Sequence, residues 1–234
     1  MPFYYYYDPT YSLVLIGLLL CLAASARVRS TYAKYGRVRS RSGLTGREAA
    51  EQILRSAGIY DVRIEHVSGN LTDHFDPGNR VLRLSDATYQ SASVAAVGVA
   101  AHECGHAIQH SRGYAPLKFR SAIVPVANFG SAIAWPLILL GLLFNSRSSY
   151  LLIQIGILAF SFAVLFQLVT LPVEFNASRR AVQILGESGM LLSDELSMTK
   201  KVLRAAALTY VAGAASAILQ LLRIILLTGG RRRE

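Results

Sequence analysis

Residues 121–172 read SAIVPVANFGSAIAWPLILLGLLFNSRSSYLLIQIGILAFSFAVLFQLVTLP, and this stretch decides the fold class of the chain. It holds two apolar runs, 121–144 and 150–172, and neither contains a charged side chain. A helix that crosses a bilayer needs about 20 apolar residues. The link at 145–149 carries only Arg147, so the stretch predicts two consecutive membrane-spanning helices.

Two further segments extend this pattern to about four spans. Residues 7–26 contain the core LVLIGLLLCLAASA, preceded by the run Tyr4–Tyr7, which fits an aromatic belt at a membrane interface. Residues 205–227 carry no charge before Arg223, which we expect to snorkel to the far interface. A cleaved signal peptide ending at Ala26 is the alternative for the first segment, but no Lys or Arg precedes its apolar run.

The composition agrees with a membrane protein and excludes a disordered one. Hydrophobic residues make up 53% and charged residues 16% of the chain, against about 25% charged in soluble domains. The net charge of +10 comes from basic residues beside the apolar runs, which indicates membrane topology rather than nucleic acid. Cys21 lies in an apolar run and Cys104 in a polar motif, so no disulfide is predicted.

Basic residues also predict the orientation. Residues 27–120 hold 14 Lys and Arg, and 173–204 hold five, so both segments are expected on the cytoplasmic side and the amino terminus outside. The carboxy-terminal run Arg231–Arg233 would then fall outside, against this rule. Either the larger basic cluster dominates, which we favour, or the fourth segment is re-entrant.

The polar segment 27–120 predicts a small α+β lobe. Thr45 and Glu48 form a capping-box pattern that opens a helix within 43–57. Residues 62–67 and 81–84 alternate apolar and polar side chains and predict two strands. A long helix is expected from Ser85 or Asp86 through about Gln109. The strand before it is a candidate edge strand for pairing with an extended peptide.

The chemistry concentrates in His102-Glu103-Cys104-Gly105-His106, an HExxH motif. On a helix, residues four apart share a face, so both imidazoles can reach one zinc ion. Glu103 is then placed to act as general base for a zinc-activated water. The preceding run SVAAVGVAA has small side chains that allow close helix packing. Cys104 is predicted to be a small packing residue.

A catalytic zinc takes three protein ligands and keeps one position open. Two crossings return the chain to the same side at 173–204, where Glu174 is the strongest candidate for the third ligand. Rival ligands remain in the same segment and the lobe: Glu187, Asp194, Glu195 and His74. The other histidines, His66 and His110, are predicted to be exposed. Four side chains are candidate donors to the substrate oxyanion, namely His74, Tyr89, Arg179 and Arg180.

Several motifs together resemble the YugP-type neutral zinc metallopeptidases of bacterial membranes. The matching stretches are YYYYDPTY, GLTGREAAEQIL, LTDHFDP, VLRLS, VAAHECGHAIQH and LPVEFNASRRA, and they cover the chain from Tyr4 to about Ala181. The resemblance implies a multi-pass peptidase of the bacterial inner membrane, and the basic residues predict its active site on the cytoplasmic side. It also implies one Zn²⁺ per chain held by His102, His106 and Glu174, with Glu103 as the catalytic base.

The EFNASRRA stretch is also similar to the glutamate region of CAAX prenyl proteases and HtpX-type membrane peptidases. Those families have an aspartate four residues after the glutamate, as a partner to a ligand histidine. Here Ser178 occupies that position, and Asn176 stands nearby. A neutral partner is expected to orient the imidazole more weakly than a carboxylate does.

We therefore predict a mainly α, polytopic membrane protein with about four transmembrane helices and a small α+β zincin-like lobe. The predicted function is a zinc metalloendopeptidase that acts on a peptide or membrane-protein substrate. The predicted partners are the lipid bilayer and either a second copy or another membrane protein, without nucleic acid. Two alternatives stay open: a zinc-stabilised scaffold without activity, and a zinc transporter, which the uncharged runs 121–144 and 150–172 disfavour.

Overall fold

The computed structural model describes residues 8–144 and 147–229. The tyrosine run Tyr4–Tyr7 and the basic run Arg231–Arg233 lie outside the described residues. The chain divides into two compact units, which are described separately. The apolar unit comprises Met1–Ala23, Arg120–Val169 and Tyr210–Glu234, and the sheet unit comprises Ala24–Phe119 and Thr170–Thr209.

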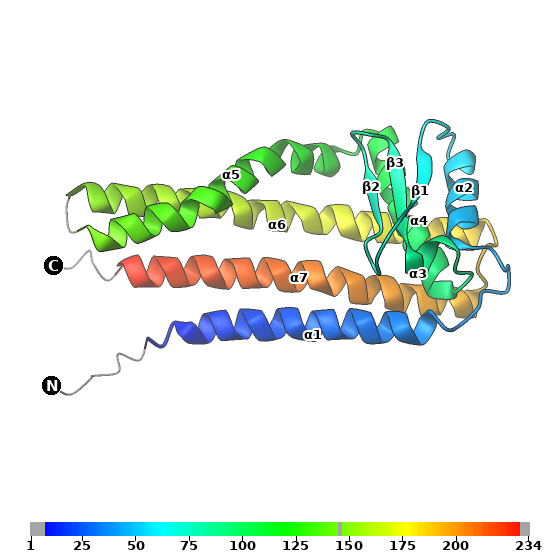
Figure 1. Ribbon diagram of the computed structural model, residues 1–234, viewed down its shortest axis with the longest axis horizontal. Helices are drawn as coiled ribbons and strands as arrows, with labels where there is room; N and C mark the ends of the chain where they lie inside the picture. Colours follow the sequence, from blue (N-terminus) through cyan, green and yellow to red (C-terminus); the bar gives the residue numbers. More distant parts are fainter. Residues whose placement is uncertain (1–7, 145–146, 230–234) are drawn as a thin grey trace. The chain divides into compact units, whose positions relative to one another are not determined.

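Four long helices among the described residues are long and apolar enough to cross a membrane, which confirms the prediction of about four. They are α1 (Tyr11–Tyr35), α5 (Ala115–Leu143), α6 (Arg147–Glu187) and α7 (Ser193–Gly229) (Figure 1). Each continues beyond its predicted span into polar sequence, and the span limits themselves stay predictions. α7 is one uninterrupted helix, which gives no support to a re-entrant fourth segment.

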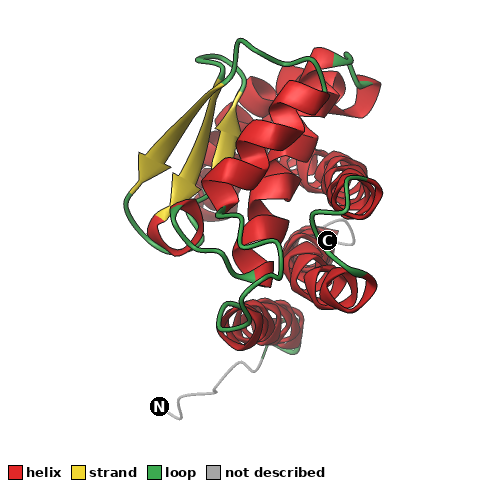
Figure 2. Cartoon of the chain, turned by 90° about the vertical axis from the view of Figure 1, so that its right-hand side faces the viewer, coloured by secondary structure: helices red, strands yellow, loops and turns green. Residues whose placement is uncertain are grey.

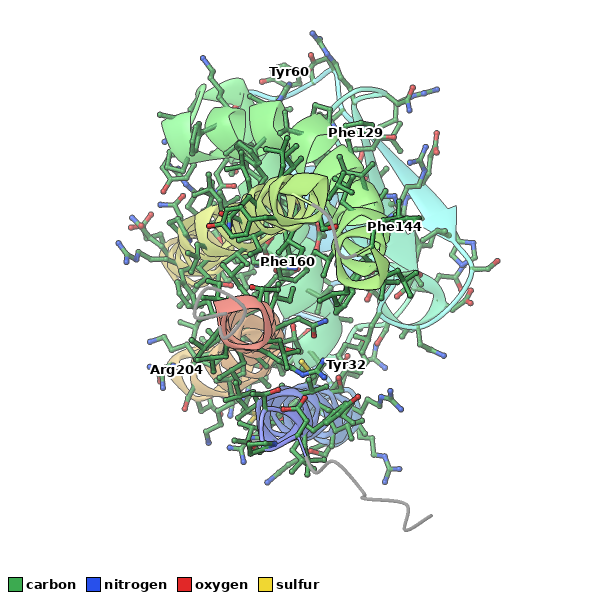
Figure 3. The ribbon with its side chains drawn as sticks, turned by 90° about the vertical axis from the view of Figure 1, so that its left-hand side faces the viewer. Tyr32, Tyr60, Phe129, Phe144, Phe160 and Arg204 are labelled. Atoms are coloured by element: carbon green, nitrogen blue, oxygen red, sulfur yellow. The ribbon has the colours of Figure 1, made fainter. Side chains whose placement is uncertain are left out.

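Glycines bring neighbouring helices of the apolar unit into close contact. A Cβ atom on Gly130 of α5 would lie 2.6 Å from the Ala159 carbonyl oxygen of α6. A Cβ atom on Gly17 of α1 would lie 2.7 Å from Ser216 Oγ of α7. Small residues permit this approach in membrane helices. Large apolar side chains such as Phe129, which is 67% exposed, cover the outside of the unit (Figure 3).

Arg223 contacts two side chains of the apolar unit, and its snorkelling to the membrane interface stays a prediction. Its guanidinium forms an ion pair with Asp8 at 3.4 Å and lies 4.2 Å from the ring centroid of Tyr11. The Arg223 side chain is only 14% exposed. The carboxylate and the aromatic face therefore replace water around this charge, which the apolar sequence near Arg223 did not reveal.

The sheet unit begins with the short helix α2 (Gly46–Ser56), whose capping box between Thr45 and Glu48 is confirmed. The apolar face of α2, including Ile53, packs into the main core of this unit. Three strands follow: β1 (Arg63–Val67), β2 (His74–Asp76) and β3 (Val81–Ser85). β3 lies in the middle, parallel to β1 and antiparallel to β2 (Figure 2).

The central place of β3 overturns its prediction as an edge strand for a peptide. Both of its sides already carry a strand, so the edges of the sheet are β1 and β2, and the sequence analysis predicted no strand at β2. β2 is three residues long and shows no apolar alternation, so its pattern gave no strand signal. The Asp73 carboxylate holds it in place by accepting hydrogen bonds from the amide and hydroxyl of Ser85 in β3.

The single long helix expected from Ser85 or Asp86 to Gln109 is also wrong. The structure has a one-turn helix, α3 (Asp86–Tyr89), and a separate helix, α4 (Val94–Ser111). Ser93 caps α4, because its hydroxyl accepts a hydrogen bond from the Ala96 amide. The Val94 amide donates outside the helix, to the carbonyl oxygen of Val38. The Ser93 cap and the contact with Val38 therefore begin a new helix at Val94, where helical periodicity alone would continue the preceding one.

Gly105 sets the contact between α4 and α6 within the sheet unit. A Cβ atom at Gly105 would lie 2.7 Å from the carbonyl oxygen of Ala177 and 3.1 Å from its Cα. Side chains do not tolerate such distances to a backbone, so the crossing of the two helices requires glycine here. The next core residues of α6, Ala181 and Leu185, are also fully buried.

We predict that Gly105→Ala destabilises the fold at this crossing. Forcing one methyl group into a packed interior costs about 1–3 kcal/mol, which corresponds to a fall in Tm of roughly 2–12 °C for a chain of this size. Thermal unfolding in detergent measures the change. Gly78→Ala, in an exposed turn where a Cβ atom would meet only Asp76 Oδ1 at 3.4 Å, is the control and should unfold like the wild type. An unchanged Tm for Gly105→Ala would show that the helices can separate at little cost.

Candidate metal centre

His102 and His106 stand one turn apart on the same face of α4. Their ring centroids are 4.8 Å apart and the rings meet edge to face, at 86°. Their side chains are only 13% and 12% exposed. The prediction that both imidazoles can approach one point is therefore met by the backbone of a single regular helix.

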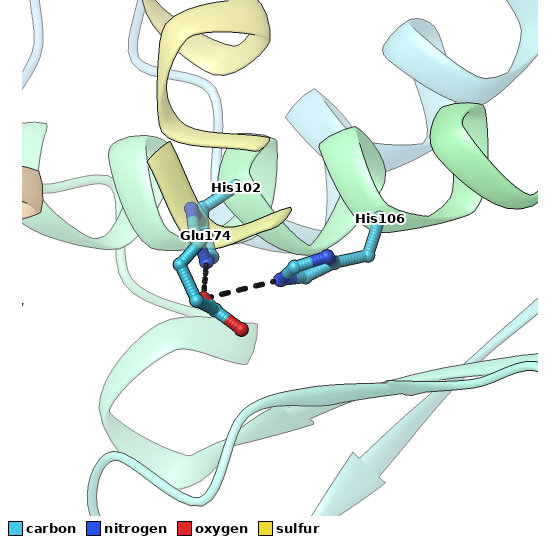
Figure 4. A group of neighbouring side chains, drawn as sticks. All are labelled: His102, His106 and Glu174. Carbon is cyan, nitrogen blue, oxygen red and sulfur yellow. Dashed lines mark hydrogen bonds and ion pairs between the residues drawn. The ribbon is translucent and has the colours of Figure 1, made fainter. Parts of the chain in front are cut away.

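Glu174 reaches the two histidines from α6, 68 residues after His106 in the chain. Its Oε2 atom lies 3.2 Å from His102 Nε2 and 3.5 Å from His106 Nε2 (Figure 4). One potential ligand atom from each residue falls within 4.8 Å of the others. Two imidazole nitrogens and one carboxylate oxygen are a donor set that zinc accepts, so these residues fit the ion.

Each histidine also has a contact on its Nδ1 atom, away from Glu174. Ser178 Oγ lies 3.1 Å from His102 Nδ1, at the position where the similar families have aspartate. Gln109 Oε1 lies 3.0 Å from His106 Nδ1. The sequence reasoning did not single out Gln109. Its spacing of three residues from His106, which puts both on one helix face, was the signal that could have found it.

Charges around His106 favour its protonated form in the metal-free protein. Burial by itself lowers the pKa of His106, but the hydrogen bond to Glu174 and the nearby charges of Glu103 and Glu174 outweigh it. The pKa of His106 is therefore raised above that of an ordinary imidazole. The Glu103 residue is only 8% exposed, and its carboxylate has no hydrogen-bond partner among residues 8–144 and 147–229.

The rival acidic ligands are occupied elsewhere. Asp194 pairs with the Arg41 guanidinium, and Glu187 accepts a hydrogen bond from Gln183. Glu195 is buried, and it accepts hydrogen bonds from the backbone amides of Arg41 and Leu192. These contacts hold helix starts and loops in place. In the part of the chain that the structure describes, Glu174 alone joins the two histidines of the HExxH motif.

The candidate oxyanion donors are not gathered around the three ligands by any contact of the described residues. His74 lies on the edge strand β2, where its Nδ1 donates to the Thr72 carbonyl. The Tyr89 ring packs against His66 at 5.4 Å between centroids. Arg179 is exposed, and the Arg180 guanidinium donates to Asn176. A donor role for any of them stays a prediction.

The remaining predicted residues lie as expected. His66 and His110 are exposed, and His110 packs against Phe75 of β2 at 5.8 Å between ring centroids. Cys104 is fully buried, and burial together with the nearby Glu103 charge raises the pKa of its thiol. A buried thiol that keeps its proton fits a packing residue.

Comparisons with known proteins show the family of the chain. Residues 10–229 match a family model described as "Putative neutral zinc metallopeptidase". The chain is also 48% identical over 222 residues to the "Putative membrane protease YugP" of Bacillus subtilis (strain 168). That alignment covers 95% of this chain and 97% of the relative. No solved structure matches the chain.

We predict that zinc binding depends on the Glu174 carboxylate. Elemental analysis of the detergent-purified chain should find one zinc per wild-type chain and little in Glu174→Ala, because two imidazoles hold the ion weakly without a third ligand. Glu187→Ala removes a carboxylate from the same helix outside the centre and should keep the zinc. Full zinc content in Glu174→Ala would move the third ligand elsewhere.

The raised pKa of His106 predicts opposite pH trends for zinc affinity and for metal-free stability. Zinc needs the neutral imidazole, so its affinity should rise with pH over the range in which His106 loses its proton. A group with a raised folded-state pKa stabilises the fold below its unfolded pKa of about 6.5, and this stability is lost as pH rises through the folded pKa. Chelator competition and thermal unfolding of the metal-free protein measure the two trends. A zinc affinity that is constant over this range contradicts the assignment.

Proposed function

The chain belongs to the neutral zinc metallopeptidase family, and from this premise we propose that it hydrolyses peptide bonds at the centre formed by His102, His106 and Glu174. The observation that carries the proposal is the convergence of these three side chains from two helices that are far apart in the sequence. Their burial supports a metal site, because a buried carboxylate beside two imidazoles needs a compensating charge.

In this proposal His102, His106 and Glu174 hold one zinc ion. When bound, the ion supplies Lewis-acid chemistry, which polarises a carbonyl group and makes a water molecule more acidic. The three ligands leave one coordination position for substrate, as in catalytic rather than structural zinc sites. The contacts of Ser178 and Gln109 on the opposite ring nitrogens keep both imidazoles aimed at the centre.

Glu103 is proposed as the general base. It follows His102 on α4, and its charge is close enough to His106 to influence the pKa of that ring. Its carboxylate is free of other hydrogen bonds among the described residues, so it can accept one from water. Glu103 takes a proton from the attacking water and delivers it to the nitrogen of the leaving amine.

The edge strand β2 is proposed to bind the substrate as an added strand. β2 lies at the edge of the sheet, and Phe75 packs its ring against His110 of α4, the helix that carries the histidines. An extended peptide can pair with the open edge through main-chain hydrogen bonds, which would bring its carbonyl groups along α4. This role replaces the one that the sequence suggested for β3.

The four apolar helices associate the chain with the bilayer, and the centre is proposed to face the cytoplasm. The basic residues that follow the first span support this side, since Lys and Arg are retained there. The substrate is then a peptide or an exposed segment of a membrane protein at the inner surface.

We predict that Glu103→Gln separates chemistry from metal binding. The amide keeps the shape of the side chain but cannot accept the proton, so cleavage of a quenched-fluorescent peptide library should fall by about 10²–10⁴. Zinc content should stay at one per chain. Glu51→Gln, an exposed glutamate of α2 that pairs with Arg55, is the control and should keep full activity.

The same experiment tests the scaffold alternative. A scaffold binds zinc for stability and needs no general base, so the wild type and Glu103→Gln would both hold zinc without cleaving any peptide of the library. Equal cleavage by the two proteins would instead exclude Glu103 as the base.

A further inference from the structure

Gln109 is a buried polar side chain that connects both helices of the metal centre. It is fully buried, three residues after His106 on α4. Its Nε2 atom donates to the carbonyl oxygen of Val173, at 2.9 Å, and to Asn176 Oδ1, at 3.0 Å. Both acceptors belong to α6, and Val173 directly precedes Glu174.

These contacts fix the orientation of the Gln109 amide. The Val173 carbonyl can only accept, so the NH₂ group of Gln109 must face α6. The Gln109 oxygen then faces His106 Nδ1, at 3.0 Å. An oxygen acceptor at this distance requires a proton on His106 Nδ1. In the zinc-bound form, the single proton of His106 would then stay on Nδ1, and Nε2, the nitrogen that faces Glu174, would hold the ion.

Arg180 extends the chain of hydrogen bonds by one residue. Its Nε atom donates to Asn176 Oδ1, at 2.8 Å. A guanidinium is always charged and has no acceptor, so it fixes the direction of the Asn176 amide. The Asn176 oxygen therefore receives two hydrogen bonds, one from Arg180 and one from Gln109. Every donor and acceptor between Arg180 and His106 is determined by this charge and by the Val173 carbonyl.

The contact on His102 Nδ1 does not fix the position of a proton in the same way. Its Nδ1 atom meets the hydroxyl of Ser178, which can donate or accept by rotating its hydrogen. Ser178 is therefore compatible with either neutral tautomer of His102. Among the described residues, the Nδ1 contact of His106 selects one tautomer and the Nδ1 contact of His102 does not.

We propose that Gln109 is a positioning residue that holds His106 in its Nδ1-protonated tautomer, and that Asn176 and Arg180 hold Gln109 in the orientation that this requires. The inference rests on the proposed zinc centre and names the residues that prepare one of its ligands. Because Gln109 also bridges α4 to the backbone beside Glu174, it links the positions of two ligands on different helices.

The test measures zinc alone, by chelator competition on the detergent-purified full chain. Removing a partner of a ligand histidine commonly weakens metal affinity by 10–100-fold, and we expect a loss in about this range for Gln109→Met. Gln183→Met is the matched control: it changes an exposed glutamine of α6 that donates a hydrogen bond to Glu187, and it should bind zinc like the wild type.

A pair of variants at Asn176 separates the hydrogen-bond chain from simple packing. Asn176→Asp keeps an oxygen that accepts from both Gln109 and Arg180, so zinc affinity should stay at the wild-type level. Asn176→Leu has a similar size but no acceptor, so its affinity should fall. Equal affinities of the Asp and Leu variants overturn the role of Asn176, and wild-type affinity in Gln109→Met overturns the proposal. The Asn176 pair decides the matter if Gln109→Met does not fold.

The tautomer itself can be observed by NMR of ¹⁵N-histidine-labelled, metal-free protein in a Glu174→Ala background, where no Glu174 carboxylate competes for a proton on Nε2. With Asn or Asp at position 176 the His106 proton should be on Nδ1, and Asn176→Leu should show a mixture with Nε2. One unchanged tautomer in Asn176→Leu overturns the chain of hydrogen bonds. Neither readout uses peptide cleavage, so failure of the proposed enzymatic function remains distinguishable from failure of this inference.

Discussion

The contact between Gly105 and Ala177 is the constraint on which the candidate centre depends. The backbones of α4 and α6 approach here so closely that a single added methyl group would overlap a carbonyl oxygen. Gly105 lies between the two histidines, and Ala177 lies one helical turn after Glu174. A wider crossing would withdraw the carboxylate from both imidazoles, since helices are rigid over one turn. Close packing at Gly105 therefore sets the distance between Glu174 on α6 and the two histidines on α4.

The electrostatics of the centre follow from this geometry. Glu174 is 2% exposed, and a buried carboxylate is stable only with charged or hydrogen-bonding partners. The two imidazoles provide those partners in the metal-free chain, and this raises the pKa of His106. Beyond them, the histidines meet a hydroxyl and an amide rather than carboxylates. The Glu103 carboxylate next to the centre has no hydrogen-bond partner within 8–144 and 147–229, which leaves it available for proton transfer in the proposed reaction.

Much of the local structure could be predicted because its signals are local. Capping of α2 depends on Thr45 and Glu48, three residues apart, and the four long helices depend on uninterrupted apolar runs. The errors arose where a distant residue decides the local structure. The Val38 carbonyl helps to begin α4 at Val94, and Asp73 fastens the short strand β2 to β3. The partners in these contacts are 56 and 12 residues apart, beyond the reach of periodicity.

The sequence by itself determined the membrane class and singled out His102, Glu103 and His106 as candidate site residues. The hydropathy of a run and the four-residue spacing on a helix are properties of neighbouring residues. It also made Glu174 a strong candidate, but left it among rivals. The tertiary structure decided which acid meets the histidines, because Asp194 and Glu195 are engaged by Arg41 while Glu174 lies one turn from the glycine contact. It also brought Gln109 and Asn176 together, since their partnership depends on the packing of two helices that are separated by more than 30 residues of chain.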